Sequence, residues 1–157
     1  MQVIGDSVHV REAREEDAEA ICRLSSEELG YECSPELVKA NFMKLQPDRE
    51  KVFAAVSGET VLGFVHVEKY QVLYADAMAN ILGLAVDRTV QHQGIGRALM
   101  SAAEQWAKEN GIPAMRLNSG AARTEAHAFY RAVGYTETKR QARFFKELVA
   151  DDTVPGL

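Results

Sequence analysis

The sequence predicts an α/β (α+β) fold, in which a mixed central sheet of about six or seven strands is flanked by about four helices. Short alternating or wholly apolar runs indicate strands, and longer runs with apolar residues every three or four positions indicate helices. The two kinds of run are interspersed along 157 residues, which is close to the size of one domain. We therefore expect a single domain over residues 1–157, with its core at 8–148 and a frayed tail at 151–157.

Seven runs have the length and pattern of strands. They are residues 8–11, 52–56, 61–69, 80–86, 114–118, 135–138 and 142–148. The polar turn at 57–60 joins the second and third runs as a hairpin. The run at 80–86 is almost continuously apolar, as is typical of a strand buried on both faces.

Four segments have the pattern of amphipathic helices. They are residues 13–29, 35–45, 94–110 and 124–133. Ser34 and Pro35 form a helix-start signal, with an N-cap hydroxyl followed by a proline at the first helical position. Gly30 and Gly134 follow the ends of two segments, where glycine commonly ends a helix.

Composition limits the function classes. Apolar residues make up 46% of the chain and the net charge is −5, so we expect a globular protein without a general attraction to nucleic acid or anionic membranes. The N-terminal residues lack a charged segment followed by an apolar one, and no apolar run approaches the ~18 residues of a membrane span. Cys22 and Cys33 are expected to be free thiols in a cytoplasmic protein. The histidines and cysteines lack the spacing of a metal site.

A glycine-rich turn, residues 91–96, joins the apolar run at 80–86 to the clearest helix. Gly94 and Gly96 permit a close backbone approach to a ligand, and the first amides of a helix have no partners within it. Together they predict a cradle for an anion, and Arg97 in the first turn would face that anion. The residues after Gly96 do not fit a Walker A loop, and Leu99 and Arg116 stand where a dinucleotide fingerprint needs a glycine or alanine and an acid.

This turn resembles the Q/R-x-x-G-x-G/A acetyl-CoA signature of the GNAT acetyltransferases, and the order of elements is similar to that family over residues 8–148. The resemblance implies the GNAT fold with acetyl-CoA as co-substrate. Backbone amides of the turn would hold the pyrophosphate, and the strand before it would pair with the pantetheine arm. The coenzyme-binding residues implied are Leu84, Ala85, Val86, Gln91, His92, Gln93, Gly94, Ile95, Gly96, Arg97 and Ala98.

A second match lies in the helix at 124–133. Arg123, His127 and Tyr130 share one helical face, and the stretch from Phe129 to Tyr135 is similar to the F/L-Y-x-x-x-G-F/Y pattern of the family. The resemblance implies that Tyr130 is the general acid that protonates the departing sulfur. It also places Arg123, His127 and Tyr130, together with Asn118, among the coenzyme contacts. The stretch from Arg123 to Tyr130, Arg-Thr-Glu-Ala-His-Ala-Phe-Tyr, resembles a branch of the family. That branch includes aminoglycoside 6′- and aminoalkylphosphonate N-acetyltransferase-like proteins.

The residue at the position of the family's general base differs in this chain. Many relatives carry a glutamate four residues before the position of Leu84, where this chain has Asn80. An amide is not a base, but it can orient a water molecule or the substrate. Glu68, His66 and Asp76 are the alternative bases in the sequence.

The resemblance predicts an N-acetyltransferase that acts on a primary amine of a small molecule by direct attack. Two alternatives are acetylation of a protein or peptide, and acetyl-CoA binding without catalysis, which Asn80 would favour. We expect neither nucleic acid nor membrane as a partner. A homodimer is expected, because the closing strands with Phe144 and Phe145 offer a strand edge or an apolar patch.

Overall fold

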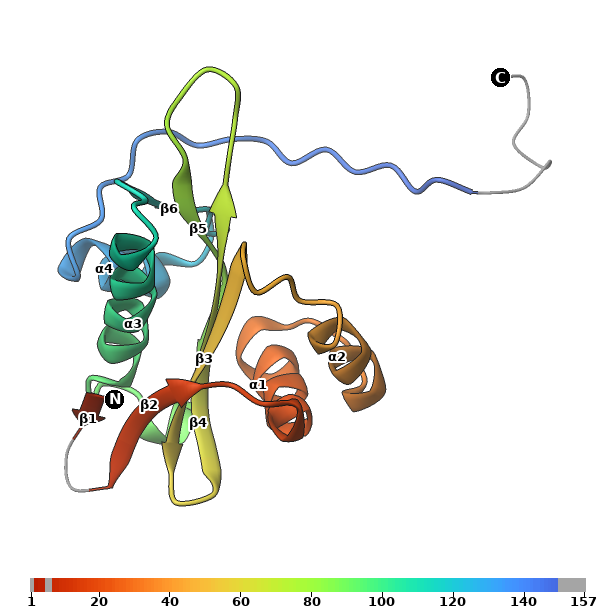
Figure 1. The fold of residues 1–157 in the computed structure, drawn as a ribbon, viewed down its shortest axis with the longest axis vertical. Coiled ribbons are helices and arrows are strands. Elements are labelled where there is room, and N and C mark those ends of the chain that lie inside the picture. Colours follow the sequence, from red (N-terminus) through yellow and green to blue (C-terminus); the bar gives the residue numbers. More distant parts are fainter. Residues whose placement is uncertain (1, 5–6, 150–157) are drawn as a thin grey trace. The chain divides into compact units, whose positions relative to one another are not determined.

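The computed structural model describes residues 2–4 and 7–149, and its first part is built on a six-stranded sheet (Figure 1). The strands are β1 (Gln2–Ile4), β2 (Val8–Glu12), β3 (Glu50–Ser57), β4 (Thr60–Tyr70), β5 (Met78–Val86) and β6 (Met115–Leu117). They lie in sequence order, with every pair antiparallel except β5 and β6. The mixed α/β class predicted from the sequence is confirmed.

The helices form close to where the sequence predicts them. They are α1 (Ala18–Leu29), α2 (Pro35–Phe42), α3 (Ile95–Glu109) and α4 (Thr124–Ala132), with short 3-10 turns η1 (Glu15–Asp17) and η2 (Arg88–Val90). Gly30 ends α1 with a φ of 78°. The Ser34 hydroxyl accepts a hydrogen bond from the Leu37 amide and begins α2. No helix in the described ranges has the length and apolar character needed to cross a membrane.

The sheet is covered on both faces, by α1 and α2 on one side and by α3 on the other (Figure 1). Leu24 of α1 is fully buried against a cluster that includes Val52 and Phe64. Leu99 of α3 is fully buried on the opposite face. Residues of β4 alternate between these faces, so Phe64, His66 and Glu68 share the face of α1 and α2.

Gly63 of β4 lets the start of α3 pack closely on the sheet. A Cβ atom at this position would lie 2.8 Å from the Ala85 carbonyl oxygen and 3.1 Å from Leu99 Cδ1. We expect Gly63→Ala to lower the free energy of unfolding by about 1–3 kcal/mol, because the extra methyl group overpacks this contact. Urea denaturation measures the change. Gly83→Ala is the matched control, since its nearest neighbour would lie at 3.7 Å; equal stability losses in the two variants would contradict this explanation.

The closing strands predicted at 135–138 and 142–148 are wrong. The structure has irregular chain over residues 135–149, without pairing to any strand among the described residues. Phe144 is 93% exposed and Phe145 78% exposed. A strand needs a partner for its backbone groups, and the alternating pattern alone does not supply one. The structure instead adds β1, a short strand that the sequence pattern did not indicate. The predicted tail at 151–157 lies outside the described residues.

The chain divides into two compact units, one ending at Asn118 and the other beginning at Ser119. The first contains the sheet with α1, α2 and α3, and the second contains α4. At the end of α4, Gly134 has a φ of 98°, and the Tyr135 amide bonds the Tyr130 carbonyl at 2.9 Å.

Candidate active site

The edge of β5 that faces β6 has no strand partner beyond residue 81 among the described residues. β4 pairs with β5 along nearly all of its length, whereas β6 pairs only with residues 79–81. In the described part of the chain, no other strand continues the pairing of residues 82–86 on that edge. An open strand edge presents free N–H and C=O groups that an extended ligand can use. The family resemblance implies that Leu84, Ala85 and Val86 bind the coenzyme, and these residues lie in the open stretch.

A β-bulge lies where the open stretch begins. His66 pairs with Gly83 and the next residue, Val67, pairs with Ile81, so Leu82 has no partner in the ladder. Leu82 is 49% exposed. Bulges bend a strand and change the direction of its side chains and backbone groups. The bulge at Leu82 and the end of the pairing with β6 at Ile81 are therefore adjacent in β5.

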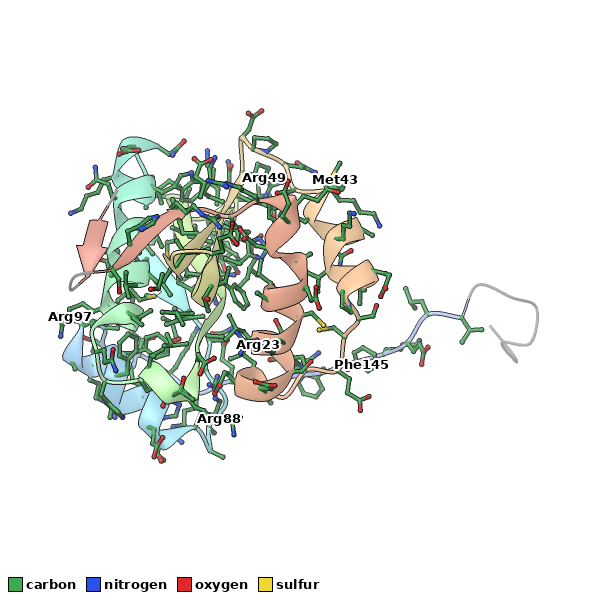
Figure 2. All side chains as sticks on the ribbon, turned by 90° about the horizontal axis from the view of Figure 1, so that it is seen from below. Arg23, Met43, Arg49, Arg88, Arg97 and Phe145 are labelled. Atoms are coloured by element: carbon green, nitrogen blue, oxygen red, sulfur yellow. The ribbon has the colours of Figure 1, made fainter. Side chains whose placement is uncertain are left out.

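The glycine turn leads directly from β5 and η2 into α3. Gly94 precedes the helix with a φ of 85°, and His92 has a φ of 66°, a left-handed conformation that is uncommon outside glycine. Within the described ranges, no backbone carbonyl accepts a hydrogen bond from the amides of residues 92–97. Unpaired amides at a helix N-terminus suit a phosphate group. The turn therefore fits the pyrophosphate of a coenzyme, and exposed Arg97 lies in the first turn of α3 (Figure 2).

Side chains fix the position of the chain just before this turn. Asp87 accepts hydrogen bonds from the amide and hydroxyl of Thr89 and pairs with Arg23 of α1 at 2.9 Å. The hydrogen bonds from Thr89, followed by the contact with Arg23, lower the pKa of the Asp87 carboxyl. Glu28 of α1 accepts a hydrogen bond from the Arg88 amide at 2.9 Å. These contacts tie the turn to α1, which the sequence pattern did not reveal.

A row of polar side chains crosses β3, β4, β5 and β6 on one face of the sheet. The row consists of Glu50, Glu68, Asn80 and Arg116, which are paired in register. Asn80 Nδ2 donates to Glu68 Oε2 at 2.8 Å, and Arg116 donates to Asn80 Oδ1 at 2.9 Å. Both ends of the Asn80 amide are thus held, which orients it. Arg116 also lies 4.3 Å from the centre of the Tyr70 ring.

The sequence missed this row because strand register is not visible in a single strand. Glu68 was one of three candidate bases, and Arg116 was noted only as a departure from a dinucleotide fingerprint. The register places the Glu68 carboxylate directly beside Asn80. A carboxylate is therefore present next to the position where the family pattern has one.

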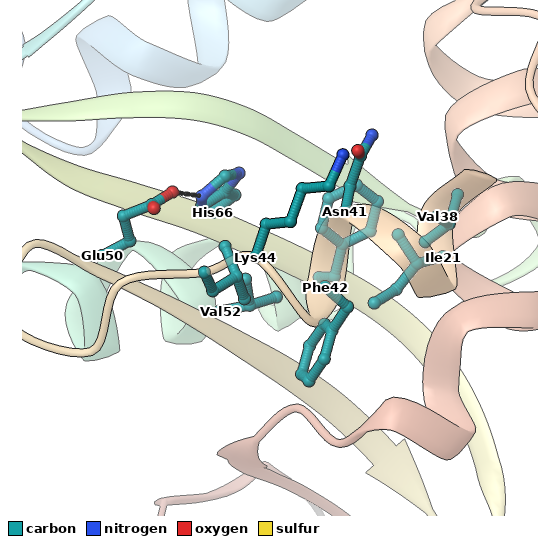
Figure 3. A pocket seen from close by; sticks show the side chains of 10 residues that line it. Ile21, Val38, Asn41, Phe42, Lys44, Glu50, Val52 and His66 are labelled. Atoms are coloured by element: carbon teal, nitrogen blue, oxygen red, sulfur yellow. Dashed lines mark hydrogen bonds and ion pairs between the residues drawn. The ribbon is translucent and has the colours of Figure 1, made fainter.

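His66 lines a cavity between the sheet and the helices α1 and α2. Its Nε2 atom lies 2.9 Å from Glu50 Oε1 (Figure 3). The cavity has a volume of about 420 Å³ and is lined also by Phe42, Lys44 and Phe64. His66 and Glu50 have side chains that are 26% and 22% exposed, so they can be reached by a molecule that enters the cavity. Asp76, the third candidate base, is exposed in the loop before β5.

In the second unit, α4 carries the residues of the second sequence match. The Nε2 atom of His127 lies 2.9 Å from the Gly120 carbonyl oxygen, and Arg123 directly precedes α4. The Tyr130 ring makes edge contacts with Phe129 and Tyr135, at 5.3 and 6.1 Å between ring centres. Burial raises the pKa of the Tyr130 phenol, and the nearby Arg123 charge acts in the opposite direction. The phenol is therefore protonated at neutral pH.

Two further polar groups lie at the junction of the units along the chain. Arg116 donates to the Asn118 side-chain oxygen at 3.5 Å, so the predicted coenzyme contact Asn118 is held by the end of the polar row. The Ser119 hydroxyl is buried, without a hydrogen-bond partner in the described part of the chain. The sequence reasoning did not single out Ser119, because a lone serine after a strand carries no pattern.

A cradle for a pyrophosphate, beside a strand edge that can pair with an extended amide-bearing arm, suits a transferase that uses an acyl-coenzyme A. The family comparison defines the transferase further. The chain belongs to the acetyltransferase (GNAT) family, whose model matches residues 18–135. It is accordingly an N-acetyltransferase with acetyl-CoA as its co-substrate.

Several characterised proteins are similar in sequence. The aminoalkylphosphonate N-acetyltransferase of Salmonella typhimurium is 30% identical over 144 residues, which cover 88% of this chain and 90% of the relative. The aminoglycoside N(6′)-acetyltransferase type 1 of Stenotrophomonas maltophilia is 33% identical over 94 residues, covering 57% and 61%. The ribosomal protein bS18-alanine N-acetyltransferase of Escherichia coli is 28% identical over 107 residues, covering 63% and 71%.

Solved structures share the fold. The aminoglycoside N-acetyltransferase AAC(6′)-Iy in complex with CoA superposes with a TM-score of 0.80 at 20% identity, covering 94% of this chain and 100% of that chain. A transcriptional regulator from Bacillus halodurans C-125 superposes with a TM-score of 0.81 at 24% identity, covering 88% and 99%. The GNAT fold predicted from the sequence is confirmed.

Proposed function

We propose that this protein transfers the acetyl group of acetyl-CoA to a primary amine of a small molecule. The observation that carries the proposal is the Glu68 carboxylate, which is held by Asn80 next to the bulge and the open edge of β5. A carboxylate next to the open edge of β5 attracts an ammonium group and can remove its proton. Two similar proteins act, by their names, on aminoalkylphosphonates and aminoglycosides, and both substrate classes are small amines.

The glycine turn and β5 form the donor side in this proposal. The amides of residues 92–97 and the Arg97 side chain bind the pyrophosphate, and residues 84–86 pair with the pantetheine arm. Support comes from the unpaired amides and the open strand edge. When bound, acetyl-CoA supplies the acetyl group as a thioester. A backbone N–H of the open stretch polarises the carbonyl that the amine attacks.

Glu68 takes the role of the general base on the acceptor side. Its Oε2 atom accepts the hydrogen bond from Asn80, while its second oxygen can accept a proton from the amine, directly or through an ordered water molecule. Asn80 positions this carboxylate. The neutral amine that results is the nucleophile, and orientation of both reactants supplies much of the rate enhancement.

Tyr130 protonates the departing sulfur in this mechanism. The family pattern around α4 and the raised pKa of its phenol support the role. We expect Tyr130→Phe to lower kcat by about 10- to 100-fold, because the departing thiolate loses its proton donor. Calorimetric titration with CoA measures whether binding is retained. Tyr135→Phe is the control and should keep most of the activity; equal losses in the two variants would assign Tyr130 a structural role.

Thiol release from acetyl-CoA, measured across a panel of amines, tests the proposed function. The panel contains aminoglycosides, aminoalkylphosphonates, polyamines, amino acids and short peptides, with a characterised acetyltransferase as the positive control. Turnover with one class of small amine supports the proposal and identifies the acceptor. Turnover with peptides alone would indicate protein acetylation instead. Binding of CoA without turnover of any amine would favour a coenzyme-binding domain.

Three further points belong to the proposal. Both units form one acetyltransferase domain, because the family match at 18–135 runs across their boundary.

A cytoplasmic location is supported by the two free thiols, since reduced cysteines are usual in the cytoplasm.

The proposal also includes a homodimer. Phe144, Phe145 and Leu148 are each more than three-quarters exposed, and exposed apolar segments commonly form interfaces. We expect light scattering to give twice the chain mass, and replacement of both phenylalanines by serine to give the monomer. A wild-type protein that is monomeric at working concentrations would remove this point.

A further inference from the structure

The two cysteines lie against each other at the junction of α1 and α2. Cys22 is on α1, and Cys33 directly precedes the Ser34 cap of α2. Their Sγ atoms are 3.3 Å apart. Cys22 Sγ also lies 3.3 Å from the Cys33 carbonyl oxygen, and Cys33 Sγ lies 3.6 Å from that of Cys22. Both cysteines are free thiols in the structure, and their spacing in the sequence did not show that they touch.

We propose that Cys22 and Cys33 form a redox-active pair, which closes to an intramolecular disulfide on reaction with a low-molecular-weight disulfide such as oxidised glutathione. The bonded sulfur–sulfur distance is about 2.05 Å, so the two atoms need to approach by only about 1.2 Å from their 3.3 Å separation. Cys33 lies in a loop rather than in a helix or strand. The approach therefore requires little change in regular structure.

The reaction proceeds by two thiol–disulfide exchanges. Cys33 loses its proton and attacks one sulfur of the reagent, whose S–S bond breaks and releases one thiolate that takes up a proton. Cys22 then loses its proton and attacks the Cys33 sulfur of the mixed disulfide, which releases the second thiol. The protein loses two electrons and two protons, and the reagent is reduced to two thiol molecules.

The environments of the two thiols determine this order. Cys22 is 6% exposed, and burial together with the adjacent Cys33 raises the pKa of its thiol. Cys33 is partly exposed and lies 3.7 Å from the Ser26 hydroxyl oxygen. The external reagent can therefore reach Cys33, whereas Cys22 reacts from within the protein with the sulfur already beside it.

The disulfide would tie the first half of α1 to the start of α2. The same helices line the cavity that contains His66, through Ile21 next to Cys22 and through Val38 of α2. A closed disulfide restricts the unfolded chain and the relative movement of the helices. Oxidation should therefore stabilise the protein and fix one wall of this cavity.

The test treats the folded protein with oxidised glutathione and measures its intact mass and its free thiols. We expect loss of two hydrogen atoms, loss of both thiols and reversal by dithiothreitol, with a peptide that joins residues 22 and 33 after digestion without reductant. The melting temperature should rise by about 5 °C. Cys22→Ala should stop at a mixed disulfide that carries one glutathionyl group on Cys33.

Cys33→Ser is the matched variant and should remain unmodified while folded, because the buried Cys22 is not reached by the reagent. Circular dichroism checks the fold of both variants, and modification of the unfolded proteins checks that each remaining thiol is reactive. A wild-type protein that retains the glutathionyl group on Cys33, forms only dimers linked through disulfides, or keeps both thiols while folded would overturn the proposal.

Discussion

Glu68→Gln is expected to lower kcat for amine acetylation by about 10²- to 10⁴-fold, the range associated with loss of general acid–base catalysis. Gln keeps the shape of the side chain and an oxygen that can accept the hydrogen bond from Asn80 Nδ2. It lacks a carboxylate to receive the proton of an ammonium group. The variant therefore removes the proposed chemistry while it preserves the packing of the row.

The comparison of three variants distinguishes the alternative bases. Glu68→Gln, His66→Gln and Asp76→Asn are measured with the same amine and a fixed concentration of acetyl-CoA. We expect the large loss in kcat only in the first variant, with the affinity for CoA retained. A larger loss on replacement of His66 would move the base to the cavity that His66 shares with Glu50 (Figure 3). Full activity of Glu68→Gln would contradict its assignment as the base.

Gly94→Val is expected to weaken binding of CoA by about 10- to 100-fold, corresponding to roughly 1.4–2.7 kcal/mol. Gly94 has a φ of 85°, a conformation that is strained for any residue with a branched Cβ. The turn must shift to accommodate valine. The shift disperses the amides of residues 92–97, which converge only while the turn and the first turn of α3 keep their geometry.

Gly111→Val is the matched control for this substitution. Gly111 follows the other end of α3 with a φ of 69°, and a Cβ atom there would meet nothing within 4 Å. Both variants should lose stability through backbone strain, but only Gly94→Val should lose affinity for CoA in calorimetric titration. Unchanged affinity in Gly94→Val, with the protein folded, would contradict the cradle assignment.

The sequence by itself determined the elements whose signals are local. The helices α1 to α4 follow from apolar residues that recur every three or four positions, and Ser34 and Gly30 mark boundaries through their own side-chain or backbone chemistry. The glycine turn is likewise local, because Gly94 and the helix that follows it are contiguous in the chain. These signals predicted the fold class and an anion-binding turn, and the resemblance of that turn to the GNAT signature implied the family and the coenzyme.

Only the tertiary structure decided which distant side chains meet. Strand register brings Glu68 and Arg116 to opposite sides of Asn80, and the packing of α1 against the chain before α2 brings Cys22 to Cys33. It also showed that residues 135–149 lack a strand partner within the described chain, although their apolar residues suggested strands. Pairing between strands and contact between thiols depend on residues far apart in the sequence. A pattern within one segment predicts that segment's conformation, but it carries no information about its partner.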